Sequence, residues 1–319
     1  MRTRTGAICE SLIEAGWLLA LVIVPLYFNV YSSRVFEPDK LAILRSLTTL
    51  MALAGLVQVA DGRLQRPAAS PEADGAGTIS WRTPLVLPVA ALAGAYVLAT
   101  ALSVTPRVSL WGSYQRLQGT YSTFSYIVVF ALVLVNLRRR EQLERLLTAI
   151  VLTSLPISLY GLLQHYQLDP LPWGGDTTFR VAANMGNPIF VAAYLIMVVP
   201  LTVARLARQV DRAVAGTVPA GVPAPERFAL WSVAGLALLV QTVVWALWGF
   251  AWGLAAAVAG AGLLVATAIL RRRPAGEWLL VAAYTTILSA QIVCVFYTQS
   301  RGPWLGLGAG LFFMALLYV

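Results

Sequence analysis

Apolar stretches with at most one charged residue recur along the whole chain, separated by polar gaps. Ten of them approach or reach the roughly 20 residues that an α-helix needs to cross about 30 Å of hydrocarbon. They cover residues 12–31, 41–60, 84–103, 122–137, 146–165, 187–206, 228–247, 251–270, 278–299 and 302–319. The pattern predicts an all-α protein, a polytopic transmembrane helix bundle of about ten spans, with residues 1–319 in one domain. The first stretch is long enough to span and lacks a clear cleavage site, so we expect no signal peptide.

One apolar stretch must fold back on itself. Residues 228–270 hold 43 positions without a charge, and a single helix of that length would run on the order of 65 Å. Glycines permit a tight turn and indole rings prefer the headgroup region. Trp245, Trp248, Gly249, Trp252 and Gly253 therefore mark the expected reversal.

The composition agrees with a bilayer as the solvent. The chain is 59% hydrophobic and 12% charged, with a mean hydropathy of +0.74, whereas a soluble protein is about a quarter charged. This balance excludes a soluble globular domain, a disordered chain and a disulfide-stapled secreted scaffold. Cys9 and Cys294 lie at different expected depths, so we expect no disulfide between them.

The positive charges fall in alternate gaps, which orients the bundle. Sixteen of the 23 Lys and Arg residues lie at 2–4, 63–82, 138–145, 205–227 and 271–273. By the positive-inside rule these gaps and the N-terminus are cytoplasmic. The net charge of +9 is thereby explained without a nucleic-acid partner. The cytoplasmic segment 66–80 has the composition of a flexible linker.

Seven cations remain for the outward side, with its loops near 32–40, 104–121 and 166–186. They are Arg34, Lys40, Arg45, Arg107, Arg116, Arg180 and Arg301. Glu37 and Asp39 lie close to the first three, so we expect local charge pairing there. Outward guanidinium groups are either membrane anchors or ligands for an anion, since their planar fork matches phosphate oxygens. Both alternatives stay open for Arg180 and Arg301.

Four motifs resemble those of the bacterial O-antigen ligase and O-antigen polymerase superfamily. They are WGSYQRLQGTYS at 111–122, YGLLQHYQLDP at 160–170, FRVAANMGNPIFVAAYL at 179–195 and TQSRGPWLGL at 298–307. The last two are the most specific. Gly302, Gly306 and Gly310 also form two GxxxG steps, which predict close approach of another backbone.

The resemblance implies a multi-pass enzyme of the bacterial plasma (inner) membrane that handles polyprenyl-diphosphate-linked glycan. It implies that Arg180 and Arg301 bind the lipid-linked diphosphate at the outward face, with Arg116 as a weaker third candidate. The implied reaction is inverting glycosyl transfer to a glycan, lipid or protein acceptor. It uses no metal and no other cofactor, and the sequence has neither a DxD motif nor a His/Cys grouping.

The family's catalytic histidine follows the SRG helix and has no counterpart here, so the resemblance implies the N-terminal part of a longer protein. The catalytic residue is therefore unassigned, and on the sequence alone we expect donor binding without turnover. His165, Asp176 and Asn187 are candidates for glycan or acceptor contacts. His165 also suits a neutral interface residue, and Asp169 and Asp176 suit turn formation.

Two other functions stay open. A multi-pass transporter or anion permease should carry ionisable residues near the bilayer midplane and broken helices, and the predicted spans show no clear example. A structural or receptor role without chemistry is the third alternative.

Overall fold

The computed structural model describes residues 4–32, 35–61, 83–171, 176–215 and 224–318, and these ranges contain helices and no strand. The expected linker 66–80 and Arg34 lie outside them. The helices are α1 (Arg4–Leu26), α2 (Glu37–Ala60), α3 (Val86–Ala101), α4 (Pro106–Trp111), α5 (Thr120–Asn136), α6 (Arg140–His165), η3 (Ala183–Met185), α7 (Pro188–Ala215), α8 (Ala224–Trp248), α9 (Phe250–Leu270), α10 (Ala275–Tyr297) and α11 (Arg301–Tyr318).

The all-α prediction is confirmed for the described residues, and a helix lies at each of the ten expected positions. Seven helices, namely α1, α2, α6, α7, α8, α9 and α10, are long and apolar enough to cross a membrane. They indicate a multi-pass membrane protein. The helices α3, α5 and α11 are apolar but shorter.

Several helices extend beyond their apolar stretches into charged sequence. The first helix begins at Arg4 rather than at residue 12, and α6 begins at Arg140 rather than at residue 146. The extension of α6 contacts α1: Arg145 Nη2 lies 2.6 Å from Oε1 of Glu14, a residue inside the first apolar stretch, and Gln142 Nε2 donates to Glu14 Oε2 at 3.0 Å. A hydropathy window misses these turns because it ends where charged residues begin, whereas tertiary contacts stabilise the helix beyond that point.

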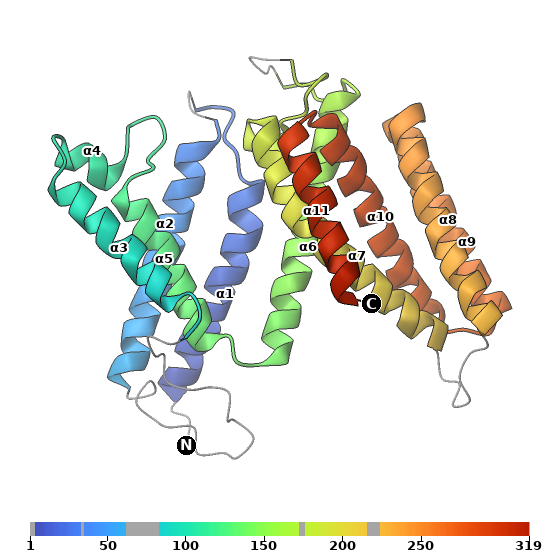
Figure 1. Ribbon diagram of the computed structural model, residues 1–319, viewed down its shortest axis with the longest axis horizontal. Helices are drawn as coiled ribbons and strands as arrows, with labels where there is room; N and C mark the ends of the chain where they lie inside the picture. Colours follow the sequence, from blue (N-terminus) through green and yellow to red (C-terminus); the bar gives the residue numbers. More distant parts are fainter. Residues whose placement is uncertain (1–3, 33–34, 62–82, 172–175, 216–223, 319) are drawn as a thin grey trace. The chain divides into compact units, whose positions relative to one another are not determined.

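The chain forms two compact units, Met1–Ala149 and Ile150–Val319, and α6 runs across their boundary. In the first unit α2 packs against α1 and α5, while α3 packs against α4 and α5 (Figure 1). A buried cluster of Cys9, Ile13, Trp17, Met51 and Ala54 joins α1 to α2. The small Gly16 lets Met51 approach closely, because a Cβ at Gly16 would lie 2.4 Å from Met51 Cγ.

In the second unit α10 is the central helix and packs against α7, α8 and α9, while α11 packs against α7. A larger share of α10 is buried than of any other candidate span. Its Gln291 Nε2 donates to Ser154 Oγ of α6 at 2.6 Å and to Thr202 Oγ1 of α7 at 3.0 Å. These buried bonds fix α10 against both neighbours.

The expected hairpin is present: α8 and α9 lie side by side and Gly249, with φ +97°, separates them (Figure 1). Trp248 and Trp252 are exposed at the reversal, as indole rings at a headgroup level require. Trp245 differs, because it is buried and packs on Gly253, where a Cβ would lie 2.3 Å from its ring. Gly253 therefore serves helix packing rather than the turn.

The prediction of close backbone approach at the GxxxG glycines is wrong for the described residues. A Cβ at Gly302 or Gly310 would meet nothing within 4 Å, and one at Gly306 would lie 3.5 Å from Ile196 Cδ1. The GxxxG spacing permits another backbone to approach α11, but no backbone among the described residues packs against these glycines. The pairing of Cys9 and Cys294 was correctly excluded, since both are free and buried.

Candidate functional site

The segment before α7 is anchored to the ends of two helices. Gln164, buried in the last turn of α6, accepts a bond from Ala183 N at 2.7 Å and donates to Ala183 O at 3.3 Å. Val181 N donates to Tyr297 O at 3.1 Å, which attaches the same segment to the end of α10. The loop with the expected site residues is therefore held in a defined place.

His165, the last residue of α6, is part of this anchor. Its Nδ1 lies 2.6 Å from Thr178 O, and its ring stacks on Tyr297 with centroids 3.5 Å apart and an angle of 18°. Only half-buried, the imidazole joins the loop to α10. Both of the sequence-based interpretations, an interface residue and a ligand contact, are compatible with this position.

Two tyrosines beside His165 reach the end of α8. Tyr297 Oη donates to Ala246 O at 2.8 Å, and Tyr166 Oη donates to Trp245 O. Carbonyls in the last turn of a helix lack intrahelical partners, so these phenols satisfy them. Burial raises the pKa of the Tyr166 phenol, which keeps it protonated and able to donate.

Arg180 and Arg301 lie beside the same turn between α10 and α11. Arg180 Nε donates to Thr298 O at 3.3 Å, and Arg301 follows Ser300 as the first residue of α11. Both side chains are exposed, and neither forms an ion pair with a described residue. The structure thus brings these two predicted residues to the same turn, and no carboxylate of the described residues neutralises them.

Asp176 and Asn187 form local turns. Asp176 Oδ1 accepts bonds from Thr178 N at 2.9 Å, Thr178 Oγ1 at 2.5 Å and Phe179 N at 3.1 Å. These bonds, the Thr178 hydroxyl first, lower the pKa of the exposed Asp176 carboxyl. Asn187 Oδ1 accepts from Ile189 N at 3.0 Å and caps α7. Turn formation therefore accounts for Asp176, and helix capping accounts for the Asn187 carbonyl.

Arg116 lies in the first unit, in the loop between α4 and α5. Its Nε is 3.8 Å from Glu37 Oε2, and its side chain is 70% exposed. An exposed pair at that distance contributes little stability, so Arg116 remains available to a ligand.

The expected pairing of Arg45 with the nearby carboxylates is wrong. Arg45 is 8% exposed, and its guanidinium donates to Ser122 Oγ at 2.8 Å, Trp111 O at 2.9 Å and Leu117 O at 2.6 Å. Its Cζ also lies 4.6 Å from the centroid of the Tyr121 ring. Burial removes Arg45 from water, so it must find acceptors in the fold, and it clamps the loop that carries Arg116.

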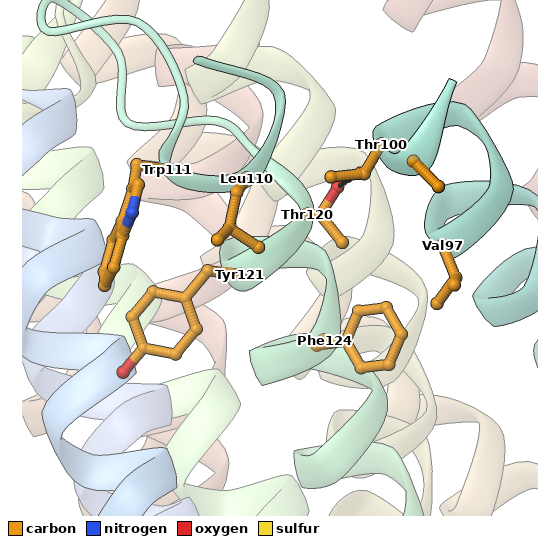
Figure 2. Close-up of a pocket in the computed structure, with 8 residues that line it drawn as sticks. Val97, Thr100, Leu110, Trp111, Thr120, Tyr121 and Phe124 are labelled. Carbon is orange, nitrogen blue, oxygen red and sulfur yellow. Dashed lines mark hydrogen bonds between the residues drawn. The ribbon is translucent and has the colours of Figure 1, made fainter. Parts of the chain in front are cut away.

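A cavity of about 530 Å³ lies between α3, α4 and α5 of the first unit, with mainly apolar walls (Figure 2). It is lined by Val97, Thr100, Ala101, Leu110, Trp111, Thr120, Tyr121 and Phe124. Trp111 and Tyr121 meet edge to face at 5.4 Å. The hydroxyls of Thr100 and Thr120 bond to each other at 2.5 Å, so they present no free polar group to the cavity.

Sequence reasoning missed Arg45, Gln164 and Tyr297 as organisers of these regions. The sequence feature that could have identified them is a polar side chain within or at the end of an apolar span, because such a group needs a hydrogen-bond partner inside the protein. Among the described residues, no group of three or more His, Cys, Asp or Glu side chains is placed to hold a metal ion.

Comparison of the chain with protein families, curated proteins and solved structures finds no match.

Proposed function

We propose that this protein binds a polyprenyl-diphosphate-linked glycan at the outward membrane face and takes part in its transfer to an acceptor. The reaction is a metal-independent, inverting glycosyl transfer in cell-surface polysaccharide synthesis, of the O-antigen ligase or polymerase type. The protein acts in the bacterial plasma membrane. The observation that carries the proposal is the pair Arg180 and Arg301, both exposed and both beside the Thr298–Ser300 turn.

The chemistry of this pair suits a diphosphate. A guanidinium donates two parallel hydrogen bonds to a phosphate, and such charge-assisted bonds are stronger than neutral ones. Neither arginine has a carboxylate partner in the described structure, so the positive charge of both is available to an anionic ligand. Negative charge also develops on a departing diphosphate, which fixed positive groups stabilise.

The first unit, taken by itself, also carries features that suit a lipid-linked anion. Its cavity of about 530 Å³ has apolar walls, and Trp111 in its lining is bonded through its carbonyl to Arg45. A hydrocarbon chain makes favourable van der Waals contacts with such walls. Arg116, exposed on the adjoining loop, suits the anionic head of the same kind of ligand.

The test measures binding of undecaprenyl diphosphate to the purified chain in detergent. Arg180→Lys and Arg301→Lys each keep the charge but lose the bidentate fork. A lost charge-assisted bond is worth roughly 1.5–3 kcal/mol, so each variant should bind about tenfold to a hundredfold more weakly.

Arg208→Lys is the matched control, because Arg208 is an exposed arginine of α7 in a gap expected to be cytoplasmic. It should bind like the parent. Equal affinity of the parent, Arg180→Lys and Arg301→Lys would reduce both arginines to membrane anchors and remove the main support for the proposal.

A further inference from the structure

We infer that His165 is the general base of the proposed transfer: its Nε2 accepts the proton of the attacking hydroxyl group. The inference rests on the proposed function and assigns the catalytic residue that the sequence left open. It replaces the sequence-based expectation of donor binding without turnover. It stands on two contacts that fix the ring and its tautomer, and on a third that attaches Arg180 to one of the same backbone segments.

The hydrogen bond of Nδ1 determines the tautomer. Nδ1 lies 2.6 Å from the backbone oxygen of Thr178, and a carbonyl oxygen only accepts. Nδ1 therefore carries a proton, and in the neutral ring Nε2 holds the free lone pair. Nε2 has no hydrogen-bond partner among the described residues, so it is free to accept a proton from a substrate.

The surroundings also stabilise the ring after it accepts that proton. The Thr178 carbonyl strengthens its bond to Nδ1–H when the imidazole becomes a cation. The face of Tyr297, stacked at 3.5 Å and 18°, attracts a cation through its negative quadrupole. Tyr297 is itself held by its bond to Ala246 O at 2.8 Å, so the stack is a fixed support.

The same backbone segments hold His165 and the proposed diphosphate ligand Arg180. Thr178, which binds His165, precedes Arg180 by two residues. Tyr297, which stacks on His165, precedes Thr298, whose oxygen binds Arg180 Nε at 3.3 Å. The same two backbone segments therefore position the imidazole and the guanidinium. A base and the group that binds the departing diphosphate need such a fixed arrangement.

The step balances without a metal or another reactant. The acceptor O–H bond breaks and its proton moves to His165 Nε2. The acceptor oxygen forms a bond to the anomeric carbon, and the bond from that carbon to the diphosphate oxygen breaks with its electron pair on the diphosphate. Configuration inverts at the carbon, and Nε2 later returns the proton to water.

The experiment separates a base from a structural link through a matched substitution. His165→Asn keeps an N–H donor at the position of Nδ1 and so keeps the bond to Thr178 O, but it has no basic nitrogen. The probe is undecaprenyl-diphosphate-linked N-acetylglucosamine, bound to the purified 319-residue chain. One nucleophile is an alcohol, glycerol, and the other is azide, which has no proton to remove.

We expect parent and His165→Asn to bind the probe equally, and the variant to transfer to glycerol about 10²- to 10⁴-fold more slowly, the usual contribution of general-base catalysis. Glycosyl azide should form at similar rates in both. Gln167→Asn is the control, because Gln167 is an exposed loop residue two positions after His165. It should bind the probe and react with both nucleophiles like the parent.

Three results would overturn the inference alone. They are parent-like transfer to glycerol by His165→Asn, a loss of the azide reaction in that variant, and no product from parent with bound probe. Failure of the parent to bind the probe would instead overturn the proposed function, and with it the inference.

Discussion

Replacing Arg45 should release the loop that carries Arg116. Arg45→Met removes the guanidinium bonds to Trp111 O at 2.9 Å, to Leu117 O at 2.6 Å and to Ser122 Oγ. It keeps an unbranched apolar side chain in the buried position, so the main loss is of hydrogen bonds rather than of packing. The loop between α4 and α5 should then open more often.

The structure sets the size of the effect. Ser122 Oγ also donates to Leu117 O at 2.7 Å, so that carbonyl keeps one partner. Taking the low value of about 1.5 kcal/mol for each of the two carbonyl bonds gives about 3 kcal/mol, roughly two orders of magnitude in a local opening equilibrium. Arg45→Lys, whose ammonium can retain one of these acceptors, should lose about half as much free energy.

Hydrogen exchange measured by mass spectrometry reports that opening directly. Peptides covering residues 112–122 should exchange about a hundredfold faster in Arg45→Met and about tenfold faster in Arg45→Lys. Arg107→Met, which removes an exposed arginine of the neighbouring α4, is the control and should exchange like the parent. Exchange in Arg45→Met within about threefold of the parent would refute the clamp.

Two further predictions concern membrane topology and helix packing. In a background without the two native cysteines, Leu168→Cys should react with a membrane-impermeant thiol reagent in cells with a permeabilised outer membrane, and Ala215→Cys should not; the opposite result would invert the topology. Gly253→Ala should lower the free energy of unfolding by about 1–3 kcal/mol, because its Cβ would lie 2.3 Å from the buried Trp245 ring. Gly262→Ala in the same helix meets nothing within 4 Å and should be neutral or stabilising in a thermal unfolding assay, so equal losses would contradict the packing argument.

The candidate site was predictable only in part. Motif and charge reasoning selected Arg180 and Arg301, and the structure places both beside one turn. It also selected His165, but without its partners. The contacts to Thr178 and Tyr297 join residues 13 and 132 positions away, and no periodic pattern within one helix encodes such a pairing.

The sequence by itself determined the helical class, the positions of the helices and the α8–α9 reversal, because hydropathy and helix length act locally and each apolar stretch reports on its own solvent. Helix ends in charged sequence escaped it: the first turns of α6, before residue 146, carry Arg145, whose partner Glu14 lies 131 positions away on α1. Only the tertiary structure decided which polar groups are buried and what satisfies them. Arg45 looked like a surface cation among carboxylates, yet its acceptors come from residues more than 60 positions away. A buried polar group must take its partner from whichever segment packs against it, and that choice belongs to the fold as a whole.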